Sequence, residues 1–530
     1  MSPEQKRAAK IVLVAMTLAN AMILVDQTAV PLALPSIMES FDSGSKQVQW
    51  VLTCSLLPLA ALLVFTGRLG DLIGLRKVFL TGAVVFITGS VLAGISPSLE
   101  ILLACRVLQG VGGALMLPLS VAIVNSTFPA EERGKALGTM GGMAAVAAAL
   151  GPTIGGLLTS FIDWRAVMLI NVPLAIATVL LTLRYVPDIE PAHNDREKVD
   201  IPGTVLLSIV LAGIVFGLSQ SQVWGWDSPG VYGPLIAAVL AAAVFFVHER
   251  RARSPLVDFS LLRRRNYLGA SLSQLLSGMA EIGLGVIFPL LLILNLEMTP
   301  AEAGIALIPT TVPMIIVAPL AGSWYDRVGG RVPLITGYLL LAASAVLLAI
   351  AANTDKYLEL LPGLLLYGIG LSLVLTTNDP VSLDEIDADD EGQASGVSAT
   401  AEQFGGALGI AILYSIFHGA YVSHLNSTVS SDPNIPDFAP GTENRLRDAI
   451  EAAEATGLHP DSFDPDLQKY LQATETASNL GYEITFIVVA AIALAAAAVT
   501  GWLVRKPPED PNADPNAPAT NNRAVSLPSR

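Results

Sequence analysis

Long apolar segments alternate with short polar ones along almost the whole chain. Each apolar segment is about twenty residues long, which is the length that a helix needs to cross about 30 Å of hydrocarbon. Charges or clusters of glycine and proline bound fourteen such segments. They lie at residues 11–35, 46–66, 78–96, 99–123, 136–160, 166–186, 201–220, 231–248, 267–294, 302–322, 332–352, 357–380, 393–418 and 482–504. The pattern predicts an all-α membrane protein with fourteen transmembrane helices.

The spacing of these segments predicts how the chain is divided. Residues 1–190 hold a first bundle of six helices, residues 200–250 an inserted pair, and residues 265–420 with 481–505 a second bundle of six. The polar stretch 419–481 is expected to be an extracytoplasmic loop, in which Glu443 to Ala455 favours a short helix. The tail 506–530 is rich in Pro, Asn and Ala, and we expect it to be disordered.

Composition agrees with a membrane protein, because only 14% of the residues are charged and 52% are hydrophobic, whereas soluble domains carry about 25% charged residues. Cys54 and Cys105 both lie inside apolar segments, so the sequence supports neither a disulfide framework nor a metal site built on cysteine. The basic segment Met1 to Lys10 leads into an apolar stretch without a small-residue cleavage site, which predicts a first transmembrane helix rather than a signal peptide.

Lysine and arginine predict the orientation, because they concentrate in cytoplasmic loops. If the amino terminus lies inside, 23 of the 30 basic residues fall in inner segments and only six in outer ones, with Arg106 inside a helix. We therefore expect both termini in the cytoplasm. The net charge of −15 argues against nucleic acid as a partner, since a phosphate-binding surface needs a basic face.

A tight turn with paired opposite charges joins the second and third predicted helices, and a degraded copy of it joins the tenth and eleventh. The candidate conformational residues are Gly67, Arg68, Gly70, Asp71, Gly74, Arg76 and Lys77 in the first copy, and Asp326 and Arg327 in the second. The first copy resembles the signature loop of the major facilitator superfamily. A basic loop with a turn explains either copy alone but explains the pair less well. The resemblance implies two six-helix halves that rock about a central site.

The fourth predicted helix contains Arg106, in a stretch similar to the motif of that superfamily in which a buried arginine serves proton coupling. A buried arginine is costly and needs a partner. Asp26 lies in a segment that looks like the first-helix motif of the fourteen-helix drug:proton antiporters, the multidrug or quaternary-ammonium exporter type. Residue counts place both side chains roughly 13 Å below the outer ends of their helices, so we expect them in one layer. A static ion pair that only fixes packing is the alternative.

The fifth predicted helix contains a glycine- and proline-rich stretch made of Gly151, Pro152, Gly155 and Gly156. It resembles the antiporter motif that separates exporters of the superfamily from its sugar symporters. Glycines let neighbouring backbones approach closely and proline can kink a helix, which suits a bending or sliding element. Trp164-Arg165, Asn171-Val172-Pro173 and Trp224-Gly225-Trp226 add to the likeness, which spans residues 11–420.

Proton-driven export needs a carboxyl group that loads a proton and whose charge alters binding or conformation. Asp26 is the first candidate, and Glu281 and Glu402 follow because they lie roughly 21 Å and 15 Å into their helices. Burial disfavours the charged form, so both can bind a proton near neutral pH, and both can neutralise a cationic drug. A packing role is equally open for each. Asp379, next to Pro380, is interpreted as a helix-end residue.

Polar uncharged residues supply further cavity candidates. Gln109 is the first choice for substrate binding because it lies one turn from Arg106, and Gln27 is the next. Hydrogen bonding between helices is an equally open role for these residues and for Gln274 and Gln403.

Other function classes are disfavoured. The sequence contains no GxxxxGK[ST] phosphate loop for an ATP-driven pump and no HExxH metal motif for a membrane enzyme, and the repeated loops favour alternating access over a channel. We therefore predict a monomeric secondary exporter of amphipathic or cationic drugs in a bacterial cytoplasmic membrane. It would exchange its substrate for protons and need no cofactor. Export of a dedicated natural product, a siderophore or a lipid is the alternative, which the sequence does not separate from drug export.

Overall fold

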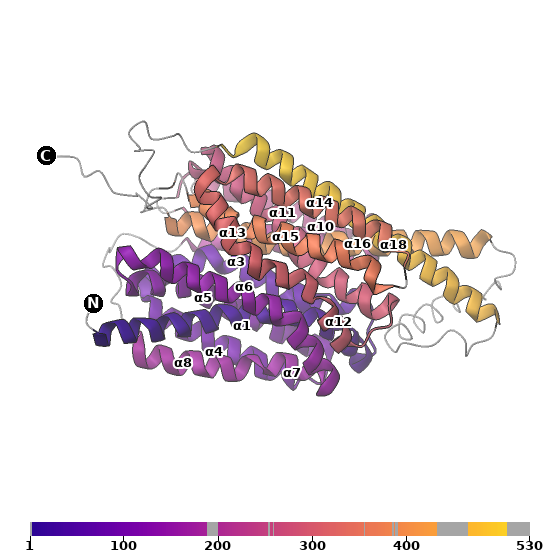
Figure 1. Ribbon diagram of the computed structural model, residues 1–530, viewed down its shortest axis with the longest axis horizontal. Coiled ribbons are helices and arrows are strands. Elements are labelled where there is room, and N and C mark those ends of the chain that lie inside the picture. Colours follow the sequence, from indigo (N-terminus) through magenta and orange to yellow (C-terminus); the bar gives the residue numbers. More distant parts are fainter. Residues whose placement is uncertain are drawn as a thin grey trace.

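The computed structural model describes residues 3–187, 200–252, 255–257, 259–354, 356–383, 386, 391–431 and 465–505. Every regular element in these residues is a helix (Figure 1). The short helix expected from Glu443 to Ala455 and the tail 506–530 lie outside the described residues.

The first half of the bundle holds six membrane spans. They are α1 (Pro3–Phe41), α3 (Trp50–Ile73), α4 (Leu75–Gly94), α5 (Leu99–Thr127), α6 (Ala130–Phe161) and the broken pair α7 (Trp164–Leu169) and α8 (Asn171–Tyr185), with the short α2 (Ser45–Val48) before α3. The inserted pair follows as α9 (Ile201–Trp224) and α10 (Pro229–Glu249).

The second half repeats this arrangement. It consists of the 3-10 helix η1 (Leu261–Arg263), α11 (Arg265–Leu290) with its π-helical end η2 (Leu291–Asn295), α12 (Pro300–Ala306), α13 (Ile308–Val328), α14 (Arg331–Ala351), α15 (Tyr357–Leu383), α16 (Glu391–Ser431) and α18 (Pro465–Leu503). The two halves pack alike, because α1 lies on α6 as α11 lies on α16, and α4 lies on α5 as α14 lies on α15. The inserted helices pack on each other, and α9 also contacts α3 and α16.

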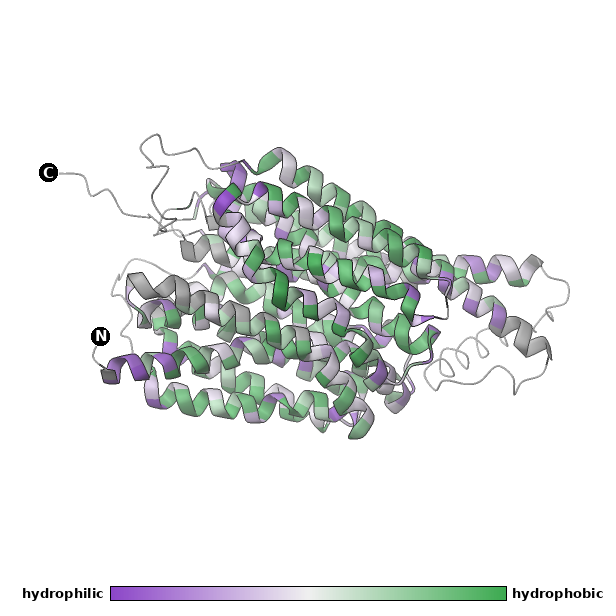
Figure 2. Cartoon of the chain, viewed as in Figure 1, coloured by the Kyte–Doolittle hydropathy of each residue, from purple (hydrophilic) through white to green (hydrophobic). Residues whose placement is uncertain are grey.

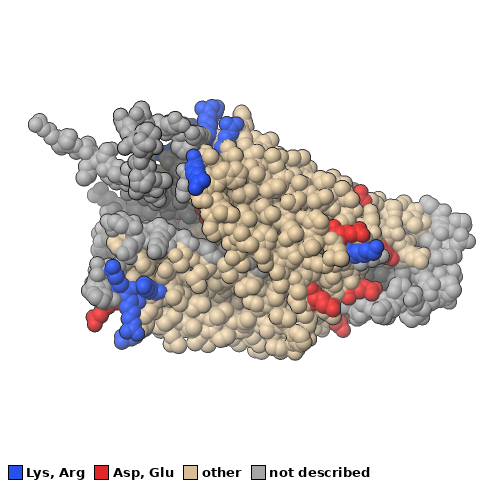
Figure 3. Space-filling view, viewed as in Figure 1, with Lys and Arg blue, Asp and Glu red and all other residues tan. Residues whose placement is uncertain are grey.

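The described part of the chain contains twelve helical runs that are long and apolar enough to cross a membrane, and shorter apolar stretches at Trp50–Leu63 and Val146–Phe161. Together they match the fourteen predicted segments. The chain enters α1 and leaves α18 at the same end of the bundle (Figure 1). Apolar residues cover the middle of the bundle (Figure 2), and Lys and Arg gather at the end where α1 begins, whereas acidic residues gather at the other end (Figure 3).

Several helices extend beyond their predicted bounds. The largest difference is at the predicted loop 419–481, because α16 continues to Ser431 and α18 already begins at Pro465. The projecting ends of both helices carry polar residues, and a small apolar cluster of Tyr421, Leu425, Ala473 and Ala477 packs between them (Figure 2). Hydropathy identifies only the part of a helix that lies in lipid, so it underestimates the length of a helix that continues into water.

Side-chain caps fix several helix starts. Asp163 accepts a hydrogen bond from the Arg165 backbone N–H at 2.8 Å and begins α7, and Asp200 accepts from Gly203 N–H at 2.9 Å and begins α9. Thr299 and Glu302 form a reciprocal capping box at the start of α12. These caps satisfy amide groups that would otherwise lack partners at the helix ends.

The two signature loops are shorter than predicted. Most of the stretch Gly67 to Lys77 is helical, and the chain turns only at Gly74, whose φ of 107° favours glycine. The second copy turns at Gly329, with φ 76°. The side chains of Arg68, Asp71 and Asp326 lie outside the described part of the structure, whereas those of Lys77 and Arg327 are exposed.

The arginine that follows each turn makes the same contact in its own half. Arg76 Nη2 donates to the backbone oxygen of Leu183 at 2.7 Å, and Arg331 Nη2 donates to that of Gly501 at 2.6 Å. Both acceptors lie in the last turn of the final helix of their half, where the helix dipole favours a cation. The internal repeat therefore extends to single hydrogen bonds.

Candidate functional site

A buried ion pair lies in the first half of the bundle. Arg106 Nη1 on α5 donates to Asp26 Oδ2 on α1 at 2.7 Å, and the two side chains are only 1% and 3% exposed. Arg106 Nε also donates to the backbone oxygen of Val51 at 2.7 Å, and Asn171 Nδ2 on α8 donates to Asp26 Oδ1 at 2.8 Å. The predicted contact between the acid and the guanidinium is confirmed, and each partner has further hydrogen bonds. A buried ion pair is stable only when additional hydrogen bonds satisfy its remaining donors and acceptors, as they do here.

Gln109 extends this cluster instead of lining the cavity, which corrects our expectation that it would face substrate. Its Oε1 accepts from Arg106 Nη1 at 2.9 Å, and its Nε2 donates to Ser90 Oγ on α4 at 2.8 Å. Gln109 is fully buried and is absent from the lining of the central cavity.

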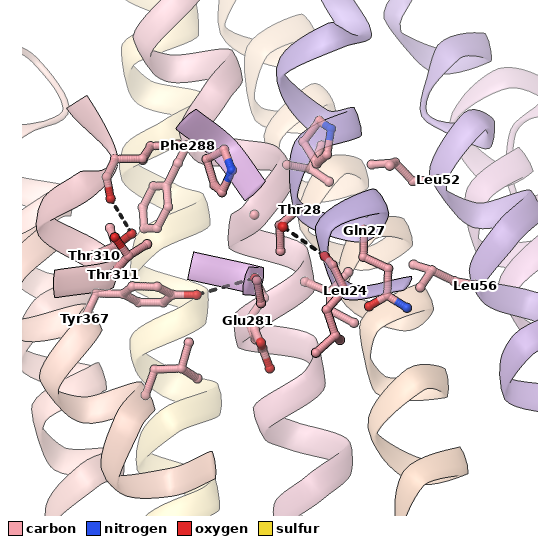
Figure 4. A pocket seen from close by; sticks show the side chains of 18 of the residues that line it. Leu24, Gln27, Thr28, Leu52, Leu56, Glu281, Phe288, Thr310, Thr311 and Tyr367 are labelled. Carbon is pink, nitrogen blue, oxygen red and sulfur yellow. Dashed lines mark hydrogen bonds between the residues drawn. The ribbon is translucent and has the colours of Figure 1, made fainter. Parts of the chain in front are cut away.

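A central cavity lies between the halves. The first half contributes Leu24, Gln27, Thr28, Leu52, Leu56 and Arg106 from α1, α3 and α5. The second half contributes Glu281, Phe288, Thr310, Thr311, Tyr367 and Glu402 from α11, α13, α15 and α16. Apolar side chains dominate this lining, and Gln27 and Glu281 reach into it from opposite halves (Figure 4).

The second half supplies both carboxylates that line the cavity. Glu281 Oε2 is buried and has no hydrogen-bond partner in the described structure, and the Tyr367 hydroxyl donates instead to the Glu281 backbone oxygen at 3.4 Å (Figure 4). Phe288 meets the Tyr367 ring edge to face at 5.1 Å. Glu281 and Glu402 are close enough to interact electrostatically. A proton or a cationic ligand would relieve their repulsion when both are charged.

The structure groups further polar residues around Glu402, of which sequence reasoning named Gln274 and Asp379 but not Asn378. Gln274 on α11 is buried, and its Nε2 donates to Asp379 Oδ1 at 2.9 Å and to Glu402 Oε2 at 3.3 Å. Asn378 Nδ2 holds Gln274 Oε1 at 2.8 Å. Asp379, which we interpreted as a helix-end residue, thus belongs to the same network as Glu402. The polar run Thr377-Asn378-Asp379 inside an apolar helix is the sequence signal for it.

Neighbours of the key acids link the halves directly. Gln27 follows Asp26 on α1, Gln403 follows Glu402 on α16, and Gln27 Nε2 donates to Gln403 Oε1 at 3.3 Å. This bond connects the ion pair of one half with the carboxylates of the other.

The glycine-rich stretch of α6 serves two interfaces. Gly151 and Gly155 face Thr28 and Ala29 of α1, so close that a Cβ atom at either position would collide. Gly156 faces the backbone oxygen of Pro300 in the other half equally closely. Pro152 lies within α6 and does not end it.

Hydrogen bonds between the halves lie next to that contact. Thr153 Oγ1 donates to Gly304 O at 3.0 Å, and the Ala301 N–H donates to Ser160 Oγ at 2.9 Å. Ala301 and Gly304 belong to α12, which lies toward the end of the bundle opposite to the start of α1 (Figure 1), and Thr153 and Ser160 lie in the last third of α6. The halves are therefore held together at the predicted outer end of the cavity.

Comparisons with known proteins agree with this architecture. Residues 16–410 match the Major Facilitator Superfamily. The tetracenomycin C resistance and export protein of Streptomyces glaucescens is 33% identical over 94% of this chain and 92% of its own length. The multidrug resistance protein Stp of Mycobacterium tuberculosis is 31% identical over 77% of this chain and 76% of its own length.

Solved structures match the fold. A bacterial homologue of the human lysosomal transporter Spinster, in an inward-facing and unoccupied conformation, superposes with a TM-score of 0.60 at 15% identity, covering 96% of this chain and 100% of that one. The similarity shows the fold alone. Because the family match covers most of the chain and the relatives exceed 30% identity over most of their length, the chain belongs to the Major Facilitator Superfamily.

Proposed function

We propose that this protein is a secondary active exporter that exchanges amphipathic or cationic drugs for protons by alternating access. The observation that carries the proposal is the central cavity, which is mostly apolar but contains Glu281 and Glu402 from one half and Arg106 from the other. An apolar wall binds a lipophilic body, and a buried carboxylate without a partner favours either a proton or a cation. The names of the resistance and export relatives support the direction of transport.

Competition for the carboxylates gives the coupling. Glu281 and Glu402 repel each other when both are ionised, and either a bound cationic drug or a proton removes that repulsion. A protonated cavity then binds the cation weakly, and a deprotonated cavity binds it strongly. Protons that arrive from outside therefore displace the drug there, and their release inside prepares the cavity for the next drug molecule.

The ion pair in the first half is proposed to link protonation to conformation. A proton on Asp26 would remove the negative partner of the Arg106 guanidinium, which lines the cavity and would be left with an uncompensated charge. Asn171 Nδ2 donates to the same carboxylate, so protonation also changes the contact between α1 and α8. Loading Asp26 thus alters both the charge of the cavity and the packing of the half.

Rocking of the halves requires that the outer contacts separate. They include the close approach of Gly156 to Pro300 and the hydrogen bonds of Thr153 and Ser160, and no ion pair lies there among the described residues. Contacts of this kind are weak enough to break and re-form as the cavity opens outward. We also propose that both termini are cytoplasmic, because basic side chains gather at the end where α1 begins (Figure 3).

Uptake of ethidium into inverted membrane vesicles under an imposed pH gradient tests the proposal. The wild-type protein should accumulate the dye only while the vesicle interior is acidic, and Asp26→Asn should abolish accumulation while leaving the protein in the membrane. Glu359→Gln is a matched control, because Glu359 is an exposed carboxylate at the outer start of α15. Accumulation that ignores the pH gradient, or normal transport by Asp26→Asn, would contradict the coupling.

Export of a dedicated antibiotic is the second candidate. It is favoured by the tetracenomycin relative, whose similarity extends over 94% of this chain. Cells that produce the protein should be challenged with cationic dyes and with aromatic polyketides in parallel. Protection against polyketides alone would favour this candidate over general drug export.

A further inference from the structure

A hydrogen-bonded chain leads from the cavity toward the cytoplasmic end of the second half. Glu402 lines the cavity, and Gln274 Nε2 contacts both Glu402 Oε2 at 3.3 Å and Asp379 Oδ1 at 2.9 Å. The two carboxylate oxygens therefore lie no farther apart than these two bonds together allow. One water molecule is enough to bridge such a separation.

The amide of Gln274 is held in a single orientation. Asn378 Nδ2 donates to Gln274 Oε1 at 2.8 Å, so the nitrogen of Gln274 must face the two carboxylates. Gln274 is 2% exposed and Asn378 is fully buried. Asn378 Oδ1 is buried without a hydrogen-bond partner in the described structure. A free buried acceptor next to this chain is a site that a water molecule would satisfy.

The carboxylates differ in depth and in access to solvent. Asp379 lies four residues before the end of α15, about 6 Å from the inner end, and Glu402 lies eleven residues into α16, about 16 Å deep. Asp379 is exposed whereas Glu402 is partly buried. Asp379 is therefore the more exposed of the two and lies nearer the inner end of the bundle, whereas Glu402 lines the cavity.

We propose that Asp379 is the exit group for the transported proton and that Gln274 is the positioning residue that holds it against Glu402. In the inward-facing state, the Glu402 carboxyl gives its proton to a bridging water, which passes a proton to the Asp379 carboxylate. Asp379 then releases a proton to the cytoplasm, which leaves both groups as carboxylates and the water unchanged. This inference rests on the proposed proton antiport and assigns its inner half-reaction.

Other groups near Glu402 are consistent with this direction. Among the described residues, the titratable groups that act on Glu402 are Glu281 on α11, Asp379 on α15 and the Tyr338 hydroxyl on α14. Tyr338 is occupied by Ser273, to whose backbone oxygen it donates at 2.8 Å. Glu281 lies on the cavity side, so Asp379 is the acid that leads away from substrate toward the inner end.

Two transport measurements separate proton release from substrate binding. Ethidium accumulation in inverted vesicles under a pH gradient requires net proton release, whereas exchange of internal for external ethidium at equal pH requires none. Asp379→Asn and Gln274→Leu should both slow pH-driven accumulation by about 10-fold or more, as expected for loss of a positioned proton acceptor. Asp379→Asn should leave exchange within about twofold of the wild type, because Asp379 is absent from the cavity lining. Asp379→Glu should restore accumulation, and Glu359→Gln should behave as the wild type.

The accumulation and exchange rates together decide whether protons leave through Asp379. If accumulation and exchange fall together in Asp379→Asn, the residue serves folding or substrate binding and the inference is wrong. If both variants accumulate ethidium normally, proton exit does not use this chain. If the wild-type protein itself shows no response to the pH gradient, the proposed antiport fails together with the inference.

Discussion

Removing the charges of Asp26 and Arg106 tests whether this ion pair couples protons to transport or only stabilises helix packing. Asp26→Leu leaves the Arg106 guanidinium buried without its counter-ion, and Arg106→Met leaves the Asp26 carboxylate in the same position. Because both side chains are almost fully buried, each single change should cost about 3–5 kcal/mol of folding free energy. The double variant removes both charges, so it should be more stable than the two single losses predict, with a coupling of about 1–3 kcal/mol.

We do not expect the recovered stability of the double variant to restore proton-driven transport. Asn171 and Gln109 lose an acceptor and a donor in the double variant, so part of the stability loss remains even without charge. Unfolding of the purified variants in detergent measures the coupling, and pH-driven ethidium accumulation in inverted vesicles measures transport. We expect recovered stability with no proton-driven transport. A double variant that is stable and transports normally would refute a coupling role and leave the pair as a packing device.

Three further predictions concern the interfaces and turns. Gly155→Ala should reduce transport and lower the free energy of unfolding by about 1–3 kcal/mol, because the added Cβ meets the Ala29 backbone. Gly67→Ala, which has open space around it, should leave transport and stability unchanged in the same assays. Gly74→Ala should destabilise the protein by about 1–3 kcal/mol, since its φ of 107° strains any side chain, and normal thermal stability of this variant would contradict the turn geometry. Arg331→Gln should loosen the inner end of α18, which faster amide hydrogen exchange in its last turn would reveal and unchanged exchange would exclude.

The sequence by itself determined the membrane architecture. A chain in lipid must satisfy its backbone hydrogen bonds internally, so each long apolar segment has to be a helix, and the fourteen segments follow from hydropathy. The sequence also predicts that Asp26 and Arg106 are partners, because burying a charge is costly and an arginine in an apolar helix needs an acid at the same depth. The depth of a residue in the membrane follows from its distance along the helix, and this distance was sufficient to pair Asp26 with Arg106.

Tertiary structure alone decided which way each polar side chain faces. Gln109 is one turn from Arg106, yet it turns away from the cavity toward Ser90, and Asp379 near a helix end turns inward to Gln274. Hydropathy does not encode this choice, because helices in a bundle within lipid are apolar on nearly every side. The rotation of each helix is set instead by the close packing of small residues such as Gly156, whose partner lies in the other half of the chain.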